Sequence, residues 1–421
     1  MTRRDVSPVE IFLAFAFAYF FSALLRAVTA TLAPVFSAEL ALGSADLGLL
    51  AGAYFFGFAA MQLPLGRALD RHGPRRTLLA LTMLAVLGCA AFASAAGLPA
   101  LVAARALTGA GMAAGLMAPL TAYRRYFSPA AQLRANSWML MSGSLGMVAS
   151  TVPVQALLPL LGWRGLFWAL AALLLVAAAG VAWRVPRDEP AMPAGRAAEG
   201  REGGGGDGGG AGDGGYRAIV RHPLFRRMAP LGFFVYGGLI AVQSLWAGPW
   251  LTRVAGWTAA QAAQGLLGIN VAMLLAFATW GALMPRLVRR GIGAQTLMRW
   301  GLPLALLLLA WNIWLGPQAG ALHWAAWCVA CTFVAPSQPE IGAAFPAAQA
   351  GRALSAYNLV IFGGVFSVQW GLGLLIDLLR AQGLNELQAF RAAFAVFGTG
   401  GLLSYAWFLR GGVREAADNP A

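Results

Sequence analysis

The chain has 421 residues, of which 59% are hydrophobic and only 11% are charged, and its mean hydropathy is +0.67. Soluble domains carry about 25% charged residues, so this composition excludes an ordinary soluble protein and indicates one embedded in a lipid bilayer. The formal net charge is +14, and all 30 basic residues are arginine. These arginines gather in short turns between apolar segments rather than on a face interleaved with aromatic residues, which argues against nucleic acid as a partner.

Apolar runs separated by basic or Pro/Gly turns predict twelve membrane spans. Each run reaches the roughly 20 residues that a helix needs to cross about 30 Å of hydrocarbon. Backbone polar groups in hydrocarbon must bond to one another, so we expect an all-α membrane protein. In chain order the predicted spans are approximately 9–35, 46–69, 76–96, 99–123, 135–160, 163–184, 226–252, 259–285, 294–316, 319–345, 353–379 and 387–410.

The placement of the arginines predicts the orientation of these spans. If the N-terminus is cytoplasmic, the turns on that side hold most of the basic residues, whereas few lie on the other side. The turns of the opposite side hold only Arg164, Arg253, Arg380 and Arg391. Basic residues favour the cytoplasmic side, so we expect both termini inside and a multi-pass protein of a bacterial inner (plasma) membrane.

A change of composition after the sixth span divides the chain. The segment contains a glycine-rich run with acidic residues and almost nothing apolar, which is typical of a flexible linker. We therefore expect an N-terminal six-helix bundle over 1–184, a flexible Gly-rich cytoplasmic linker over 185–224 and a C-terminal six-helix bundle over 225–421. The similar segments Phe127–Ala135 and Phe345–Ala353 precede the fifth and eleventh spans, which indicates a duplicated unit.

The turn between the second and third spans carries a recognisable motif. Gly66–Arg76 reads GRALDRHGPRR, and its Gly-Pro pair predicts a tight turn between two apolar helices. With this motif, twelve spans and two halves, the chain resembles the major facilitator superfamily, whose hallmark reads approximately G-x-L-x-D-R-x-G-R-R/K. The matching residues are Gly66, Asp70, Arg71, Gly73, Arg75 and Arg76, and a second family pattern, R-x-x-x-G-x-G, is matched by Arg105, Gly109 and Gly111.

The resemblance implies twelve transmembrane helices in two pseudo-symmetric six-helix bundles, and a secondary transporter that works by alternating access. It also implies a gating role for the motif, in which Asp70 holds the cytoplasmic ends of the halves together by reaching toward the start of the eleventh helix near Arg352. The arginine that matches Arg105 is implicated in the family in interhelical contacts and in proton coupling, and both roles stay open here. The family's drug-antiporter signature in the fifth span is not matched.

Few charges lie within the predicted spans. Arg26 lies about 25 Å along the first helix from Val9, beyond the membrane midplane. A guanidinium there either binds a carboxylate through paired hydrogen bonds or extends to the outer interface. Glu340 is the only acid well inside a span, and it is either a proton-linked carboxylate or an interfacial residue.

Polar and amphipathic side chains in otherwise apolar spans are candidates for the wall of a substrate cavity, and each is equally compatible with helix packing. With Arg26, the predicted substrate-binding residues are Tyr54, Tyr236, Gln243, Trp246, Asn270, Tyr357 and Asn358, and the predicted coupling residues are Arg105 and Glu340. No His, Cys, Asp or Glu cluster has the spacing of a metal site, and no lysine is present for a phosphate loop. We therefore expect no metal, no cofactor and no enzymatic activity.

These observations predict a monomeric transporter that takes up a small organic anion, a carboxylate, together with protons. Arg26 and the scarcity of acids near it carry this prediction. One alternative is proton antiport of drugs or other hydrophobic compounds. A cation exporter would be expected to place a carboxylate in the first or fourth span, and none lies deep there. The other alternative is a non-transporting membrane receptor on the same scaffold.

Overall fold

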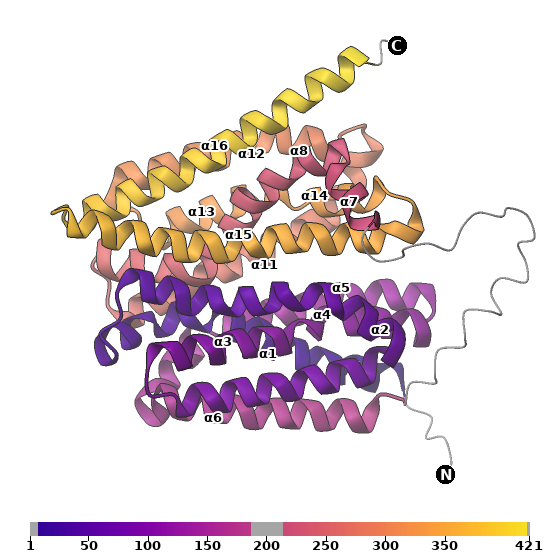
Figure 1. The fold of residues 1–421 in the computed structure, drawn as a ribbon, viewed down its shortest axis with the longest axis horizontal. Coiled ribbons are helices and arrows are strands. Elements are labelled where there is room, and N and C mark those ends of the chain that lie inside the picture. Colours follow the sequence, from indigo (N-terminus) through magenta and orange to yellow (C-terminus); the bar gives the residue numbers. More distant parts are fainter. Residues whose placement is uncertain (1–6, 187–213, 419–421) are drawn as a thin grey trace, which may run out of the picture.

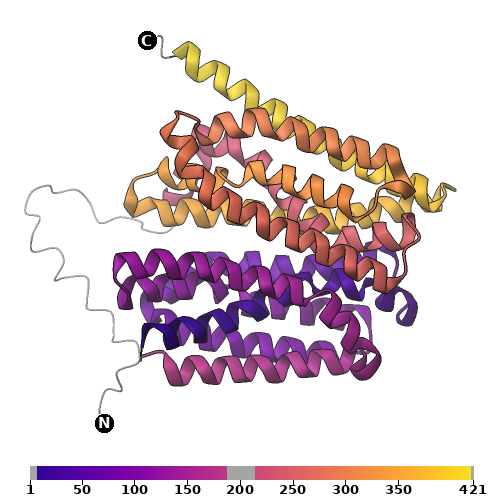
Figure 2. The same ribbon diagram turned by 180° about the vertical axis from the view of Figure 1, so that it is seen from behind.

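The computed structural model describes residues 7–186 and 214–418, which are helical almost throughout and contain no strand. Figure 1 shows two stacked halves whose helices run in roughly the same direction, and Figure 2 shows the same division from behind. The first half consists of α1 (Pro8–Glu39), α2 (Ser44–Ser94), α3 (Leu98–Met112), α4 (Ala114–Tyr126), α5 (Pro129–Ala149) and α6 (Val152–Arg184). The second half begins with α7 (Gly214–Arg221) and continues to α16 (Glu386–Asp418).

The second half contains both interrupted and continuous helices. Its seventh span is α8 (Pro223–Leu231), α9 (Gly237–Ala241) and α10 (Ala247–Pro249), interleaved with π-helical turns at Gly232–Tyr236, Val242–Trp246 and Trp250–Val254. The remaining helices are α11 (Ala259–Arg289), α12 (Ala294–Leu315), α13 (Ala321–Cys331), α14 (Ser337–Ala343) and α15 (Ala347–Ala381). Short 3₁₀ turns at Gly316–Gln318 and Thr332–Val334 follow α12 and α13.

Two glycines provide the tight turns that the sequence predicts between consecutive spans. Gly73 has φ of 77° inside α2, and Gly162 has φ of 63° inside α6. Positive φ is readily adopted by glycine, which has no Cβ, so the chain reverses there with almost no loop. The predicted second and third spans are therefore the two arms of α2, and the predicted sixth span is the second arm of α6.

The predicted fold class is confirmed. Within the described ranges, ten helical segments are long and apolar enough to cross a membrane. The fifth and tenth predicted spans are helical but interrupted: a break at Thr151 separates α5 from the start of α6, and the turn Thr332–Val334 separates α13 from α14. Pro336 follows that turn and lacks the N–H of a continuing helix.

The predicted linker is partly helical. Residues 187–213 lie outside the described part of the chain. Within the remainder of the range 185–224, α7 packs against α15, and its Ile219 side chain is buried in the hydrophobic core of the second half that also contains Met228 and Ala356. The last part of that range is therefore packed structure rather than irregular chain.

Different helix ends lie at the two ends of the molecule. We call the end where α6 finishes the linker end; there Arg184 pairs with Glu10 at 2.8 Å, and Arg75 donates to the carbonyl of Ala182 at 2.7 Å. We call the opposite end, where α2 begins and α15 finishes, the far end. The predicted orientation places the linker end in the cytoplasm.

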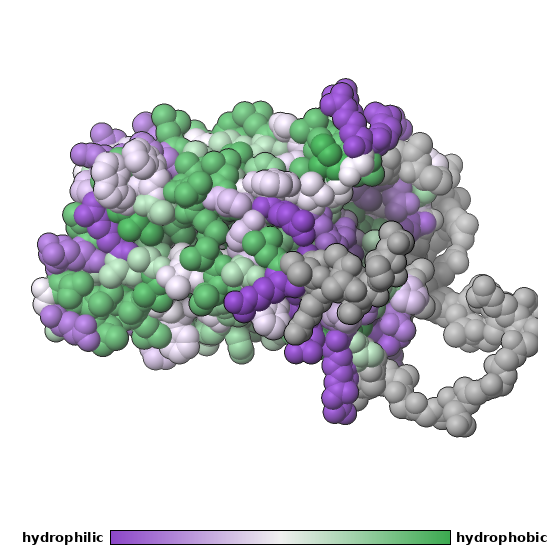
Figure 3. Space-filling view, turned by 90° about the horizontal axis from the view of Figure 1, so that it is seen from above, coloured by the Kyte–Doolittle hydropathy of each residue, from purple (hydrophilic) through white to green (hydrophobic). Residues whose placement is uncertain are grey.

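The outer surface is suited to lipid. In Figure 3 hydrophobic side chains cover the middle of the visible face, and hydrophilic ones gather toward the two ends. Leu307 of α12 is 68% exposed and Leu403 of α16 is 65% exposed, which would be unfavourable in water. Trp300 and Trp314 are exposed near the two ends of α12, where tryptophan sits at membrane interfaces.

A cysteine at position 72 tests the orientation. His72 is exposed in the turn of α2 at the linker end, whereas Cys89, Cys328 and Cys331 are buried and should react little. We expect a membrane-impermeant maleimide to leave His72→Cys unlabelled in intact cells and to label it in inside-out vesicles. Gln382→Cys, at the exposed far end, should show the opposite pattern. Labelling of position 72 in intact cells would place the termini outside.

Candidate functional site

A cavity of about 440 Å³ lies between the two halves, near the middle of the molecule. Sites for small organic molecules usually occupy about 300–1,000 Å³, so the volume suits such a ligand. The wall is mostly apolar and includes methionines and phenylalanines from both halves. These residues are Met112, Met117, Met147, Met273, Phe58, Phe277 and Phe362.

Six of the predicted substrate-binding residues line this cavity: Arg26, Tyr54, Tyr236, Gln243, Asn270 and Asn358. The other two lie outside it. The Trp246 side chain is buried and donates to the carbonyl of Gln369 at 3.1 Å, and the Tyr357 hydroxyl lies 2.9 Å from Ser337 Oγ. Both therefore pack within the second half instead of facing the cavity.

Arg26 is the one charged residue among those that line the cavity. Its Nη2 lies 3.6 Å from the thioether sulfur of Met147, a weak acceptor. Its Nε is buried and has no hydrogen-bond partner in the described part of the chain. Because no Asp or Glu lines the cavity, the guanidinium has no carboxylate of the protein within this site.

Neutral polar groups surround Arg26 and also connect the halves. The Tyr54 hydroxyl donates to the carbonyl of Ser22, one turn before Arg26, at 3.1 Å. Gln243 Nε2 donates to Asn270 Oδ1 at 2.9 Å, and Asn270 Nδ2 donates to the carbonyl of Met147 at 3.1 Å. Tyr236 and Gln243 both lie in π-helical turns, which are frequent at functional sites.

Sequence reasoning did not single out several cavity residues. Tyr19 and Ser22 lie on α1, Gln62 on α2, and Gln338 on α14. Gln338 Nε2 donates to Asn358 Oδ1 at 2.7 Å. Tyr19 and Ser22 precede Arg26 by seven and four residues on the same helix, a spacing that would have placed them on its face.

The predicted coupling residues lie outside the cavity lining. Arg105 is 1% exposed and donates to the carbonyl of Leu25 at 3.1 Å and to Thr29 Oγ1 at 2.7 Å. Its guanidinium carbon also lies 5.1 Å from the centre of the Tyr54 ring. Arg105 therefore holds the backbone of α1 next to Arg26.

Glu340 lies toward the linker end of the second half. Its carboxylate accepts a hydrogen bond from Gln295 Nε2 at 3.0 Å, and Gln295 Oε1 accepts one from Arg227 at 3.1 Å. Arg227 is 4% exposed and also donates to the carbonyl of Phe408 at 2.8 Å. This partly buried chain of hydrogen bonds joins α8, α12, α14 and α16, and sequence reasoning identified only its Glu340.

The gating motif occupies the turn at the linker end of α2. Gly73 makes the reversal, Arg75 contacts α6, and Gly66 and Arg71 face open surroundings. Arg76 is also exposed. The backbone of Asp70 belongs to α2, but its side chain lies outside the described part of the structure. Its predicted contact with the start of the eleventh helix, now α15, stays a prediction.

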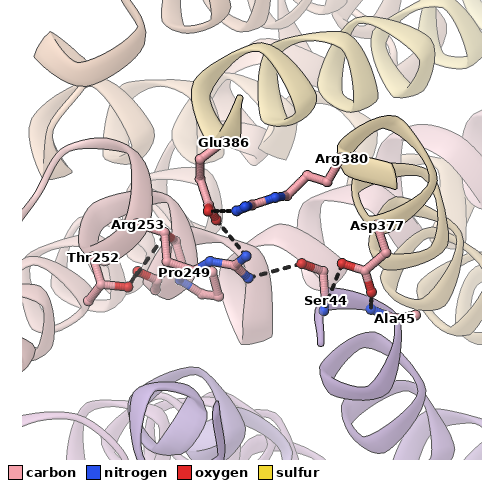
Figure 4. Close-up of polar contacts among 9 residues, drawn as sticks. Ser44, Ala45, Pro249, Thr252, Arg253, Asp377, Arg380 and Glu386 are labelled. Carbon is pink, nitrogen blue, oxygen red and sulfur yellow. Dashed lines mark hydrogen bonds and ion pairs between the residues drawn. The ribbon is translucent and has the colours of Figure 1, made fainter. Parts of the chain in front are cut away.

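At the far end, Asp377 joins the halves (Figure 4). It lies near the end of α15 and accepts hydrogen bonds from the backbone N–H groups of Ser44, at 3.1 Å, and Ala45, at 2.7 Å. These are the first residues of α2, whose N–H groups have no partner within the helix. A carboxylate is favourable there because the helix N-terminus carries partial positive charge.

Two arginines and a glutamate extend this contact (Figure 4). Arg253 donates to Ser44 Oγ at 2.9 Å and forms an ion pair with Glu386 at 2.5 Å. Glu386 also forms an ion pair with Arg380 at the end of α15. The network therefore connects the start of α2 with three segments of the second half.

Close packing of α2 against α15 continues from this network to the cavity. A Cβ at Gly48 would overlap the backbone carbonyl of Gln369, so the backbones of the two helices are in close contact at this glycine. The ring of Phe362 lies 6.2 Å from that of Phe55 and 4.6 Å from that of Phe58, and Phe58 and Phe362 both line the cavity. The far end is therefore closed.

A larger groove lies on the outer surface of the second half. It has a volume of about 630 Å³ and lies between α12 and α16. Its single charged residue, Arg391, donates to the carbonyls of Ile313 at 2.8 Å and Trp314 at 2.5 Å. The groove faces the surface expected to contact lipid, so the central cavity is the better candidate site.

The chain is similar in sequence to a known resistance protein. Over 179 residues it is 36% identical to a chloramphenicol resistance protein of Streptomyces lividans. This match covers 42% of this chain and 43% of that protein, so it spans less than half the length of the curated relative.

Solved structures share the fold of the whole chain. A bacterial homologue of the human lysosomal transporter Spinster, in an inward-facing conformation, has a TM-score of 0.76 at 16% identity and covers 99% of this chain and 100% of its own. A D-xylose–proton symporter has a TM-score of 0.71 at 15% identity, covering 95% and 97% respectively. Residues 15–367 match the Major Facilitator Superfamily. The chain therefore belongs to the Major Facilitator Superfamily and is a multi-pass membrane protein of this family of transporters.

Proposed function

We propose that the protein is a monomeric secondary transporter that takes up a small organic anion, a carboxylate, with protons, and that Arg26 binds the anion. The observation that carries this proposal is the state of the Arg26 side chain. It lines the cavity, its Nε is buried with no hydrogen-bond partner in the described chain, and its Nη2 meets only a thioether.

The energetics favour an anion as the missing partner. An arginine at the centre of a membrane helix costs about 2.5–3.5 kcal/mol on insertion scales, so its retention calls for a compensating interaction. The described cavity lining supplies no carboxylate. A substrate carboxylate would accept paired hydrogen bonds from the guanidinium fork, which is the strongest neutralising contact available to arginine.

Uptake of an anion also favours coupling to protons. Moving one negative charge into a cell that is negative inside opposes the potential by about 2.3 kcal/mol per 100 mV, so a compensating cation is needed. Arg105 binds the carbonyl of Leu25, directly beside Arg26, which supports its proposed role in linking proton movement to the anion site. In the second half, Glu340 is the carboxylate that we propose binds the coupled proton.

The test is uptake in proteoliposomes, using a carboxylate first identified by its thermal stabilisation of the purified protein. A hydrogen bond to a charged group contributes about 1.5–3 kcal/mol. We therefore expect Arg26→Gln to raise the KM about 10- to 150-fold, and Arg26→Lys to have a smaller effect. Arg299→Gln, at an exposed position outside the cavity, is the matched control.

Unchanged uptake by Arg26→Gln would overturn the anion site. Binding without flux of any compound in the unmodified protein would favour the receptor alternative.

Export of hydrophobic compounds is the second candidate. The 36% identity with a chloramphenicol resistance protein and the methionine-rich apolar wall favour it. A neutral compound would make no ion pair with Arg26. If this candidate holds, inverted vesicles with an acidic lumen should accumulate chloramphenicol as protons leave the lumen, and Arg26→Gln should leave that accumulation within about twofold.

A further inference from the structure

The cavity has polar side chains at two levels. The first level surrounds Arg26 and includes Tyr54 of α2. Gln62, also on α2, lines the cavity eight residues later, which is about 12 Å further toward the linker end. Phe58 lies between them on the same helix and packs against Phe362. The two levels are therefore separated by an apolar collar.

The packing of α2 against α15 places two more amides at the second level. The helices are antiparallel, since Ser44 contacts Asp377 and Phe58 contacts Phe362. Continuing this register brings Gln62 opposite Asn358, which also lines the cavity. Asn358 in turn accepts a hydrogen bond from a third amide of the cavity wall, on α14, so the second level consists of three amides.

These three side-chain amides have hydrogen-bonding groups without partners in the described part of the chain. Gln338 and Asn358, which both line the cavity, make one hydrogen bond with each other, at 2.7 Å. It leaves an acceptor on Gln338 and donors on Asn358 available for a ligand. Gln62 makes no side-chain hydrogen bond within the described ranges. No charged residue lines the cavity at this level. The second level can therefore bind a neutral polar group, but it offers nothing to neutralise a charge.

We infer that the substrate is an elongated amphipathic monoanion. Its carboxylate binds Arg26, its apolar middle packs against Phe58, Phe362 and the methionines, and an uncharged amide or hydroxyl group binds the amides of Gln62, Gln338 and Asn358, on the order of 10 Å from the carboxylate. This inference rests on the proposed anion site at Arg26. It excludes the smallest carboxylates, which would leave the collar unfilled, and dicarboxylates, whose second charge would meet only amides.

Four carboxylates test the charged end, the apolar middle and the neutral polar end of the inferred substrate separately. Acetate has only the charged end. Octanoate adds the apolar body, suberic acid monoamide has an amide in place of the terminal methyl group of octanoate, and suberate has a second carboxylate there. Binding to the purified protein is measured by calorimetry at a pH where the carboxylates are ionised.

We expect octanoate to bind at least 100-fold more tightly than acetate, because each buried methylene contributes to the affinity. The monoamide should bind about fivefold more tightly than octanoate, and suberate at least tenfold more weakly than the monoamide. Gln338→Leu should reduce the advantage of the monoamide and leave octanoate unchanged. Gln382→Leu, at the exposed far end, should change neither.

The outcomes distinguish this inference from the proposed function. If Arg26→Gln weakens every probe but acetate binds as well as octanoate, or suberate as well as the monoamide, the anion site stands and the elongated substrate is overturned. An advantage of the monoamide that is undiminished in Gln338→Leu overturns the amide level. If Arg26→Gln changes the binding of none of the four probes, both proposals are overturned.

Discussion

Replacing Gly48 with alanine should keep the far end from closing while leaving each half folded. A Cβ at Gly48 would overlap the backbone carbonyl of Gln369, which belongs to the other half. Backbone cannot rotate aside as a side chain can, so the two halves must separate. Overpacking costs about 1–3 kcal/mol, which changes the ratio of closed to open molecules roughly 5- to 150-fold.

Spin labels at Ala100 and Gln382, exposed at the far ends of the two halves, report this opening. Their distance distribution should shift to longer values in Gly48→Ala, with the thermal midpoint nearly unchanged. Gly57→Ala is the contrast, because its Cβ would overlap the carbonyl of Ala106 within the same half and should lower the midpoint instead. An unaltered distance distribution in Gly48→Ala would show that the helices can shift to accept the methyl group.

Replacing Asp377 with asparagine should open the same end by removing charge. The carboxylate accepts two backbone hydrogen bonds at the start of α2, and a hydrogen bond to a charged group contributes about 1.5–3 kcal/mol. Asparagine keeps one acceptor oxygen and loses the interaction with the helix dipole. We expect the open population to rise about 10-fold or more, with the rate of transport lowered because closure of the far end is less favourable.

Asp46→Asn is the matched control for this variant. Asp46 also caps the start of α2, accepting from the N–H of Gly43 at 3.0 Å, but both residues belong to the first half. Its replacement should loosen the helix end without changing the distance between the halves. Equal distance distributions for the two variants would mean that Asp377 stabilises α2 itself and not the contact between halves.

The fold was largely predictable because the bilayer imposes it. A helix must be about 20 residues long and apolar to cross, so composition alone places spans such as 163–184. Gly73 could be recognised as a turn because basic residues flank it, and Gly162 because Arg164 follows it between two apolar runs. The interruptions at Thr151 and between α13 and α14 lie inside long apolar runs, so hydropathy averaged over a whole span does not reveal them.

The site was harder to predict because depth in the membrane does not determine the direction in which a side chain points. Arg26 could be inferred because a charge in hydrocarbon is rare. Trp246 and Tyr357 have the same amphipathic character as Tyr54, yet they turn into the second half. Asp377 lies two residues from the end of a predicted span, where acids are usually solvated. Its partner is a helix start 333 residues away in the chain.

The pairing of α2 with α15 has a consequence for how the two states are balanced. At the far end, an aspartate near the end of α15 holds the first residues of α2. At the linker end, the family resemblance assigns Asp70, near the end of the first arm of α2, the mirror-image role at the start of α15. Each helix would thus offer an acid at one end and a receptive N-terminus at the other. Equivalent contacts at opposite ends would contribute equally to the two states and cancel in the free-energy difference between them. Neither state would then be much more stable than the other, and a bound substrate of modest affinity could change which state is more populated.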